Sequence, residues 1–274
     1  MNRKEVVLIT GASSGIGYET AKELVKEGYI VYAAARRTEK LKELEILNAK
    51  IIFLDVTSEQ SMKECVDSII RDEGSVGILI NNAGYGSYGA VEDVPLEEAR
   101  RQLEVNLFGL ARMAQLVLPS MRAQRYGKII NISSMGGKVH TPMGAWYHAT
   151  KFALEGFSDC LRMEVKQFGV DVVVIEPGGI RTDWGIIAAE NLRKVSKDGP
   201  YHQMSDHIAD RLHTMYSTGK GLSDPGLIAR TIVKAVTSKK PKTRYLTGSM
   251  AKPMVFLKRV LSDRLYDRLV LRFM

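Results

Sequence analysis

Residues 6–17 read Val6-Val7-Leu8-Ile9-Thr10-Gly11-Ala12-Ser13-Ser14-Gly15-Ile16-Gly17, an apolar run that passes directly into a glycine-rich loop. A helical pattern begins inside the loop and continues to about residue 27. Glycines let a backbone turn sharply and approach a pyrophosphate, while free N–H groups and the positive end of a helix bind its charge. The order of apolar strand, glycine loop and helix therefore predicts the first unit of a dinucleotide-binding fold.

The spacing of the loop glycines narrows this prediction. Gly11, Gly15 and Gly17 follow the pattern Gly-x-x-x-Gly-x-Gly, which differs from the common dinucleotide pattern Gly-x-Gly-x-x-Gly. The loop also lacks the lysine of a Walker loop, which disfavours ATP. A plain strand-to-helix turn is the alternative interpretation, and three glycines within seven residues argue against it.

The rest of the chain alternates between strand and helix patterns. Apolar or β-branched runs lie at residues 6–10, 29–35, 50–54, 76–81, 128–132, 171–176 and 243–247. Helical patterns lie at about 15–27, 38–44, 58–73, 96–124, 146–167 and 224–238. Such alternation predicts right-handed β-α-β units and a parallel sheet with helices on both faces. We therefore expect an α/β protein with one doubly wound, Rossmann-like domain of about seven strands over residues 1–274.

The composition of the 274 residues is that of an ordinary globular protein, with 45% hydrophobic and 26% charged residues. No apolar run approaches the length of a membrane-spanning helix, and the start of the chain leaves no room for a signal peptide. Cys65 and Cys160 are too few for a disulfide framework and lack metal-ligand spacing, as do His202 and His207. We expect two buried thiols, no metal and a cytoplasmic location.

The formal net charge of +8 raises the question of an acidic partner. No run of five or more basic residues occurs, and aromatic residues do not alternate with basic ones, which does not favour nucleic-acid binding. A basic surface also suits a phosphorylated cofactor or an anionic membrane.

The end of the second predicted strand indicates which nucleotide is bound. An acidic residue there binds the ribose 2′-hydroxyl of NAD, whereas an arginine accommodates the 2′-phosphate of NADP. This chain has Arg36 and Arg37 at that point and no carboxylate. An arginine fork donates paired hydrogen bonds to phosphate. Arg36 therefore predicts NADP over NAD, and we expect Arg37 to face solvent.

A tyrosine and a lysine four residues apart suggest proton transfer at Tyr147 and Lys151. On a helix these side chains share one face, so the ammonium can lower the pKa of the phenol towards the working pH. Tyr18 with Lys22 and Tyr216 with Lys220 have the same spacing. Context has to separate the three pairs.

That context is supplied by a series of motifs. They are residues 10–17, Asn81-Asn82-Ala83-Gly84, Asn106, Ser134, Tyr147, Lys151 and Pro177-Gly178-Gly179-Ile180-Arg181-Thr182. In this order and at these intervals, from about residue 5 to residue 182, the chain resembles the short-chain dehydrogenase/reductase family. Residues 31–36, 105–109 and 176–179 look most like the branch of 17β-hydroxysteroid dehydrogenases and acyl-dihydroxyacetone-phosphate reductases.

The resemblance implies carbonyl–alcohol interconversion with NADP(H), in which Tyr147 protonates the reacting oxygen and Ser134 donates a hydrogen bond to it. Lys151 would lower the Tyr147 pKa and hold the nicotinamide ribose, and Asn106 would support a water that links Lys151 to solvent. The cofactor contacts implied are Gly11, Ser13, Ser14, Gly15, Ile16, Gly17, Arg36, Asp55, Val56, Asn82, Ala83, Gly84, Tyr147, Lys151, Pro177, Gly178, Ile180 and Thr182. His148 would point away from Tyr147, and we interpret it as structural or as part of a subunit contact.

Two regions break the alternation. Residues 183–223 carry Trp184, Ile186, Ile187, Leu192, Tyr201, Met204, Leu212, Met215 and Tyr216. They could roof a bulky lipophilic substrate such as a steroid or lipid, or form an ordinary helical pair on the domain. Residues 251–274 carry Met254, Phe256, Leu257, Leu261, Leu265, Leu269 and Phe273 among Lys258, Arg259, Arg264, Arg268 and Arg272. This extension could touch an anionic membrane or pack on its own domain.

The function predicted is that of an NADP(H)-dependent oxidoreductase. The alternative is a non-catalytic NADP-binding regulator or scaffold, and the intact set of Asn106, Ser134, Tyr147 and Lys151 argues against it. By resemblance, the helices at about 96–124 and 146–167 imply a homodimer or homotetramer.

Overall fold

A computed structural model describes residues 5–273, so residues 1–4 and 274 of the predicted domain lie outside it. Within the described chain, seven parallel strands form one sheet in the order β3-β2-β1-β4-β5-β6-β7. The strands are β1 (Val6–Thr10), β2 (Ile30–Ala35), β3 (Lys50–Phe53), β4 (Ile78–Asn81), β5 (Gly127–Ile132), β6 (Val170–Pro177) and β7 (Arg244–Thr247). The predicted α/β fold with a doubly wound parallel sheet is confirmed.

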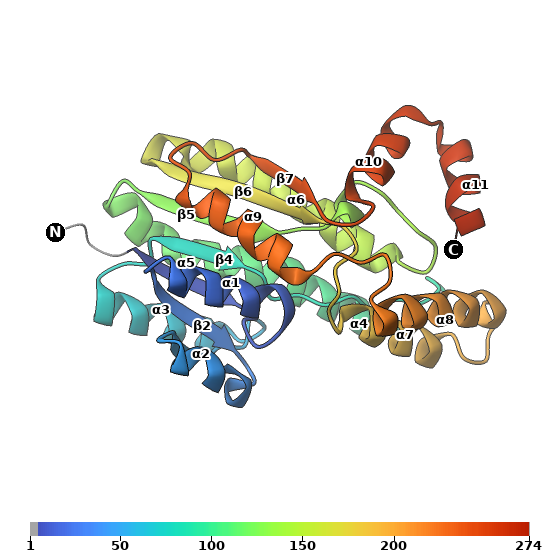
Figure 1. Cartoon of the computed structure of the whole chain (residues 1–274), viewed down its shortest axis with the longest axis horizontal. Coiled ribbons are helices and arrows are strands. Elements are labelled where there is room, and N and C mark those ends of the chain that lie inside the picture. The colour runs from blue at the N-terminus through green and yellow to red at the C-terminus, as the bar shows by residue number, and fades with distance from the viewer. Residues whose placement is uncertain (1–4, 274) are drawn as a thin grey trace.

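Helices cover both faces of the sheet (Figure 1). They are α1 (Gly15–Lys26), α2 (Lys42–Ile46), α3 (Glu59–Glu73), α4 (Leu96–Leu103), α5 (Gly109–Ala123), α6 (Ala145–Val165), α7 (Trp184–Val195), α8 (His202–Thr218), α9 (Pro225–Thr237), α10 (Ala251–Val260) and α11 (Asp263–Phe273). Short turns of other helix types are η1 (Thr38–Leu41), η2 (Glu104–Phe108), η3 (Met135–Gly137) and η4 (Lys166–Phe168). One core lies between the sheet and α1, α2 and α9, and the other lies between the sheet and α3, α5 and α6.

The alternation of side chains along each strand divides them between these two cores. In β1, Val7 and Ile9 belong to the core under α1, while Val6 and Leu8 belong to the opposite core. Successive side chains of a strand point to opposite faces, so a strand covered on both sides must be apolar throughout. This explains why the apolar runs are continuous in the sequence.

The helix predicted over residues 96–124 is interrupted by a π-helical turn. That turn is η2, and it carries the buried Asn106 between α4 and α5. The Asn106 side-chain amide donates to the carbonyl of Tyr85 at 2.9 Å and to Thr150 Oγ1 at 3.2 Å. An extra residue in a helical turn changes where a side chain points, and such turns are frequent at functional sites.

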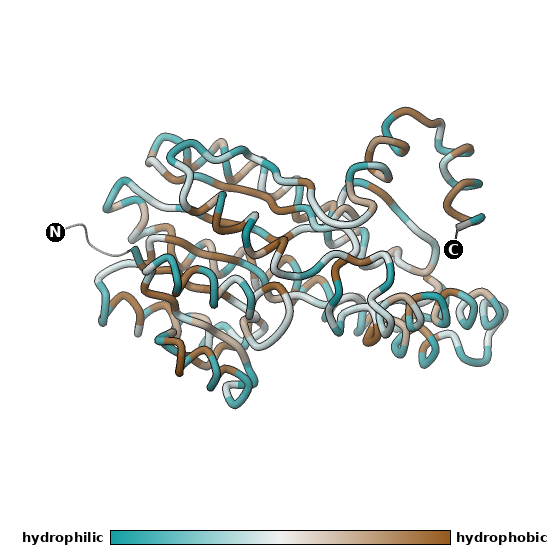
Figure 2. The backbone as a smooth tube through the Cα atoms, in the orientation of Figure 1, coloured by the Kyte–Doolittle hydropathy of each residue, from teal (hydrophilic) through white to brown (hydrophobic). Residues whose placement is uncertain are grey.

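The two regions outside the alternation are each a pair of helices. α7 and α8 pack against each other beside the carboxyl ends of the strands, and α10 and α11 form a hairpin that projects from the body (Figure 1). Hydrophobic residues concentrate along the sheet strands in Figure 2, and the hairpin alternates between apolar and polar residues.

The prediction of two buried thiols is wrong for one cysteine. Cys65 is buried in the core under α3, but Cys160 is exposed. Cys160 lies on the solvent-facing side of α6, and its neighbours Ser158 and Leu161 occupy the buried side.

Candidate active site

The site forms where four loops leave the carboxyl ends of β1, β4, β5 and β6. β4 lies beside β1 although β2 and β3 precede it in the chain, so the connections turn in opposite directions on the two sides of this pair. Ligands of open parallel sheets bind in the crevice at such a reversal. The loops bring the glycine-rich segment, the Asn82 segment, Ser134 and residues 178–182 to one edge.

The glycine loop has a conformation that side chains would prevent. Gly11 has φ +68° and Gly15 has φ +56°, in the left-handed region that favours glycine. A Cβ at Gly17 would lie 2.5 Å from Nδ2 of Asn82, and one at Gly11 would lie 2.8 Å from Cα of Ala83. The Ser14 side chain makes no capping hydrogen bond to α1, which leaves the first N–H groups of the helix for an anion.

Asn82 and Ala83 brace this loop from the next strand. Asn82 Nδ2 donates to the carbonyls of Thr10 at 3.0 Å and Gly11 at 3.1 Å. Thr10 Oγ1 accepts from the backbone N–H groups of Asn82 at 3.0 Å and Ala83 at 2.9 Å. The side chain of Asn82 therefore holds the glycine loop in place. Its position beside the loop is the one predicted, while its contact with a ribose stays a prediction.

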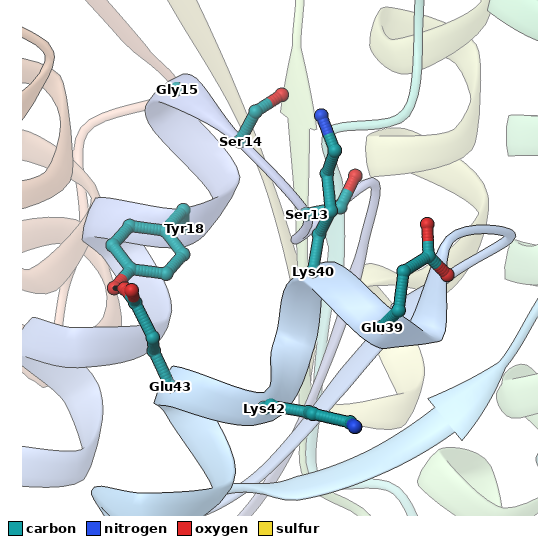
Figure 3. Close-up of a pocket in the computed structure, with 8 residues that line it drawn as sticks. All are labelled: Ser13, Ser14, Gly15, Tyr18, Glu39, Lys40, Lys42 and Glu43. Atoms are coloured by element: carbon teal, nitrogen blue, oxygen red, sulfur yellow. Dashed lines mark hydrogen bonds between the residues drawn. The ribbon is translucent and has the colours of Figure 1, made fainter.

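Basic side chains gather beside the loop at the end of β2. Arg36 and Arg37 are both exposed, and Arg37 Nη2 donates to Ser13 Oγ at 3.5 Å. Arg37 faces solvent as predicted, and its side chain also reaches back to the glycine loop. Figure 3 shows Lys40 extending from η1 toward Ser13 and Ser14, across a pocket. The pocket is lined by Ser13, Ser14, Gly15, Tyr18, Glu39, Lys40, Lys42 and Glu43.

Sequence reasoning missed Lys40, although it follows Arg37 by three residues. Lysines are common on exposed turns, so nothing in the sequence alone distinguishes this one. Its place beside Ser13 becomes visible only when η1 is set against the glycine loop.

Asp55 follows β3 and lies near the same basic group. Burial alone would raise the pKa of this carboxyl, but hydrogen bonds from Thr57 and the charges of Arg36 and Arg101 hold it below its usual value. Val56 packs against Gly109 at the start of α5, where a Cβ would lie 2.4 Å from the Val56 carbonyl oxygen. The Asp55 carboxylate accepts from Thr57 in its own turn, and Val56 closes the contact between the β3 loop and α5. The predicted contact of both residues with an adenine stays a prediction.

Tyr147 and Ser134 lie together at the end of β5. Ser134 Oγ accepts from the N–H of Gly136 at 2.9 Å and caps η3, which leaves its own proton to donate elsewhere. A Cβ at Gly136 would lie 3.1 Å from the Tyr147 ring and 3.3 Å from Ser134 Oγ. Burial raises the pKa of Tyr147 to about 12, and a hydrogen bond with Ser134 opposes that rise. Tyr147 is therefore a protonated phenol at neutral pH.

Lys151 lies one turn along α6 from Tyr147 and is buried with it. Its ammonium donates to the carbonyl of Ile132 at 2.9 Å. Burial lowers the pKa of Lys151 to about 8, although the charge of Glu155 raises it. The two side chains are neighbours as the spacing predicts, but the expected lowering of the Tyr147 pKa by Lys151 is not seen. The pKa is raised by burial, and the contribution that opposes the rise comes from Ser134.

Asn106 completes the predicted set from the opposite side. Its Oδ1 accepts from the N–H of Tyr85 at 3.0 Å, and its amide nitrogen bonds Tyr85 and Thr150. The Asn106 side chain is thus fully engaged in joining the β4 loop to α6. A Cβ at Gly84 would lie 3.1 Å from Oδ1 of Asn106, so this glycine permits the close approach.

The loop after β6 reaches the glycine loop from the other side. A Cβ at Gly15 would lie 3.1 Å from Cγ2 of Thr182. Gly178 is packed against the turn after β7, where a Cβ would lie 2.0 Å from the Ser249 carbonyl oxygen, and Ile180 is buried in the core under α1. Of the predicted residues Pro177, Gly178, Ile180 and Thr182, the last is the one that this geometry places beside the glycine loop.

Three aromatic side chains form a wall beside Tyr147, and sequence reasoning missed one of them, Tyr88. The ring of Trp184 lies 5.1 Å from that of Tyr147, and Tyr88 lies 5.8 Å from each of them. Tyr216 lies 6.1 Å from Trp184. Nothing in the sequence marked Tyr88, which belongs to an irregular segment between β4 and α4.

Residues 183–223 form the helical pair α7–α8 packed on the domain, as one of the two interpretations predicts, while their role as a roof over a lipophilic substrate stays a prediction. The pair packs on the domain through Ala188, Leu192 and Ile208, in one cluster with Tyr88 and Tyr147. It therefore covers Tyr147 with apolar side chains. Ile187 and Met204, which were predicted to roof the pocket, are exposed on the outer side of the pair.

The structure also separates the three tyrosine–lysine pairs. Tyr18 lies at the pocket mouth, where its hydroxyl donates to Glu43 at 2.5 Å. Tyr216 is on α8, but that helix ends at Thr218, so Lys220 is not on the same helix. Only the pair Tyr147 and Lys151 is buried on one helix beside Ser134.

His148 has a structural place, as predicted. Its Nε2 accepts from the N–H of Thr141 at 3.1 Å, and its Nδ1 therefore carries the proton that it donates to the Gly136 carbonyl at 2.8 Å. Burial lowers the pKa of this imidazole. The neutral ring ties the start of α6 to η3, and thereby fixes the loop that follows Ser134.

The chain is similar to known proteins over most of its length. The family model described as short chain dehydrogenase matches residues 5–191. The 3-ketodihydrosphingosine reductase of Bacteroides thetaiotaomicron is 36% identical over 246 residues, which cover 90% of this chain and 88% of that protein.

Two solved structures share the fold at similar identity. A short-chain dehydrogenase from Streptomyces avermitilis superposes with a TM-score of 0.82 at 32% identity, covering 93% of this chain and 92% of that one. A variant of actinorhodin polyketide ketoreductase crystallised with NADPH superposes with a TM-score of 0.72 at 32% identity, covering 84% and 89%. With its glycine loop, its buried Tyr147–Lys151 pair and these matches, the chain belongs to the short-chain dehydrogenase/reductase family of oxidoreductases.

Proposed function

We propose that the protein interconverts a ketone or aldehyde and the corresponding alcohol with NADP(H), using Tyr147 as the acid and base. The observation that carries this proposal is the burial of Tyr147 beside Ser134 and Lys151, at the sheet edge where the glycine loop lies. A protonated phenol in a water-poor site can donate to an oxygen on which charge develops.

The residues of the glycine loop and of β2 fit a phosphorylated dinucleotide. Gly11 and Gly17 admit no side chain, and the N-terminus of α1 is open to a pyrophosphate. Arg37 and Lys40 lie beside Ser13, and Arg36 is exposed directly after β2. We infer that these three cations hold the 2′-phosphate, which favours NADP over NAD. When bound, NADPH would supply the hydride in the reducing direction.

The chain's own groups handle the proton. As the carbonyl carbon accepts the hydride, negative charge grows on its oxygen, and the hydroxyl proton of Tyr147 moves to that oxygen. Ser134 donates a hydrogen bond to the same oxygen, because its own acceptor position is taken by the N–H of Gly136. Lys151 would stabilise the phenolate that results. Asn106, which bonds the neighbouring residue Thr150, would support a water that links Lys151 to solvent and so allows the proton to be replaced.

We expect a lipophilic substrate, because the walls around Tyr147 are aromatic and aliphatic. Tyr88, Trp184 and Tyr216 form the near wall, and α7–α8 covers it. The relative from Bacteroides thetaiotaomicron, by its name, reduces a long-chain lipid ketone. A steroid-like or acyl-lipid substrate, as in the branch that the sequence resembles, fits this wall.

We also expect a homodimer or homotetramer built on α4, α5 and α6. Phe152 and Met163 of α6, and Phe108 of η2 directly before α5, are exposed to solvent, and a subunit contact would cover them. Sedimentation of the purified chain would give its mass in solution. A monomer at micromolar concentration would contradict this expectation.

The competing function is a non-catalytic NADP-binding regulator. A single assay separates the two, namely NADPH oxidation with ketosteroids, retinaldehyde, acyl-dihydroxyacetone phosphate and small xenobiotic carbonyl compounds. We expect turnover with at least one lipophilic carbonyl. Tight NADPH binding without oxidation of any member of the panel would favour the regulator.

A further inference from the structure

The hairpin of α10 and α11 has one side that packs on the body. Tyr266 and Val270 of α11 are buried against Val139, and Met254 and Val255 of α10 join the same cluster. Val139 follows η3, the turn that Ser134 caps. The inner side of the hairpin is thus fixed to the loop that follows the active-site serine.

The outer side of the hairpin combines cations with exposed apolar groups. On α10 it presents Lys252, Phe256, Arg259 and Val260, and on α11 it presents Arg264, Leu265, Arg268, Leu271 and Arg272. The spacing of three or four residues keeps each set on one face of its helix. Phe256 is 63% exposed and Val260 56%, while Leu265 and Leu271 are 50% and 57% exposed. We call these nine residues the outer face.

The acidic residues of the hairpin are both paired away from this face. Asp263 binds Lys258 at 2.5 Å, and Asp267 binds His140 of the body at 3.0 Å. None of Lys252, Arg259, Arg264, Arg268 and Arg272 has an ion pair with any residue that the structure describes. The outer face therefore carries five uncompensated positive charges between four large apolar side chains.

We propose that the outer face is a docking surface for an anionic lipid bilayer. Basic groups gain from anionic headgroups, and apolar side chains between them can enter the boundary between headgroups and acyl chains. Within residues 5–273 no helix is long and apolar enough to cross a membrane, so the hairpin would lie on the surface. A second copy of the chain is a poor partner, because a two-fold contact would set the same five charges against each other.

Docking would also bring the membrane close to the active-site loop. The hairpin bears on Val139 and His140, a few residues after Ser134. This surface does not depend on the proposed reaction, and it can be tested without any substrate.

The test is flotation of the full-length chain with vesicles of phosphatidylcholine containing phosphatidylglycerol, compared with phosphatidylcholine alone. We expect binding to the anionic vesicles that weakens as salt is added. The double variant Arg264→Gln/Arg268→Gln should bind about 30-fold more weakly, since each basic residue near such a surface contributes about fivefold. Phe256→Ser/Val260→Ser should lose about tenfold or more, because two apolar groups no longer enter the interface.

The matched control is Ile46→Ser, which removes an 80% exposed apolar side chain from α2 at the far side of the sheet. It should bind vesicles as the unaltered chain does. Thermal unfolding monitored by circular dichroism must show that all variants are folded. The proposal would be overturned by equal binding to both vesicle types, or by a loss of vesicle binding in Ile46→Ser as large as that in the hairpin variants. It would also be overturned if the unaltered chain formed a larger oligomer without vesicles and the hairpin variants did not.

Discussion

The Lys151 ammonium nitrogen lies 6.0 Å from the centre of the Tyr147 ring, one helical turn further along α6. Both side chains are buried, and burial favours the neutral form of each. The pKa of Tyr147 therefore rises to about 12, and that of Lys151 falls to about 8. The pair therefore joins a proton donor to a cation that can lose its charge near the working pH. Lys22 lies 5.3 Å from the centre of the Tyr18 ring, but neither of these two side chains is buried. Lys220 lies beyond the end of the helix that carries Tyr216.

Replacing Tyr147 by phenylalanine should abolish turnover and leave NADPH binding intact. The change removes one hydroxyl and keeps the ring that packs against Trp184 and Tyr88. A positioned proton donor contributes about 10²- to 10⁴-fold to a rate, so kcat should fall by at least that factor. Steady-state kinetics would measure the loss, and fluorescence titration would measure the Kd for NADPH.

Tyr216→Phe is the matched control, because Tyr216 belongs to the same aromatic wall and to a tyrosine–lysine pair of the same spacing. It should change kcat by only a few-fold. Retained turnover in Tyr147→Phe would sink the assignment of the acid. Loss of NADPH binding together with a lowered Tm would point instead to a folding defect.

Arg36→Asp should reverse the cofactor preference. A hydrogen bond between a charged group and phosphate is worth about 1.5–3 kcal/mol, so kcat/KM for NADPH should fall about 10- to 100-fold while that for NADH stays within a few-fold. Arg71→Asp makes the same charge change in the last turn of α3, which leads to the amino end of β4. It should leave kcat/KM for NADPH and for NADH unaltered. A higher kcat/KM with NADH than with NADPH in the unaltered chain would already refute the NADP assignment.

The fold was predictable because its signals are local. Continuous apolar runs such as Val6–Ile9 mark strands buried on both faces, and the loop that follows contains glycines where the structure needs positive φ, at Gly11 and Gly15. The π-helical turn at Asn106 was not predictable, since it depends on hydrogen bonds to Tyr85 and Thr150. An asparagine in an apolar helical stretch was its sole trace in the sequence.

Some features of the candidate site were likewise predictable from local patterns, and others were not. The closeness of Tyr147 and Lys151 follows from their spacing on a helix. Their pKa values depend on burial, which the spacing does not indicate. The contact of Arg37 with Ser13 joins segments 24 residues apart, and Tyr88 meets Trp184 across almost a hundred residues. Such contacts are decided by how whole elements pack, so no local pattern announces them.

Stability should depend on pH through His148. Its neutral ring accepts from Thr141 and donates to Gly136, and burial holds its pKa below the ordinary 6.5. The unfolded chain therefore binds more protons than the folded one as the pH falls through about 6.5, and the free energy of unfolding decreases. His148→Gln can donate and accept without titrating, so its stability relative to the unaltered chain should improve as the pH is lowered. Urea unfolding at several pH values would measure this, and parallel curves for the two proteins would contradict it.

A buried group of charges lies behind Lys151, between α6, β6 and β7. Arg244 binds Glu155 at 3.0 Å, Glu176 at 3.3 Å and Asp159 at 2.7 Å, and Lys138 binds Glu155 at 2.9 Å. Lys138 also lies 3.6 Å from Glu176, so the buried carboxylates of Glu155 and Glu176 share the two cations, while Asp159 pairs with Arg244. Burial first, and then the negative charge of Glu155, raises the pKa of Glu176 to about 7, while Lys138 and Arg244 oppose the rise.

Glu176→Gln should therefore stabilise the protein in alkaline solution and matter little in acid. The folded-state pKa of Glu176 lies above its ordinary value of 4.5, so the folded chain binds the extra proton and loses stability as the pH rises from about 4.5 to about 7. Glutamine carries no charge to bury, so its advantage should appear over that range and stay constant above it. Arg244→Met should act in the opposite sense and destabilise by about 3 kcal/mol at pH 8, since it leaves Glu155 and Glu176 with Lys138 as their one remaining cation. That loss should shrink at pH 5, where Glu176 holds its proton.

Urea unfolding of the unaltered chain, Glu176→Gln and Arg244→Met at both pH values would measure these differences in the free energy of unfolding. A stabilisation by Glu176→Gln that is the same at pH 5 and pH 8 would show that Glu176 does not titrate in this range.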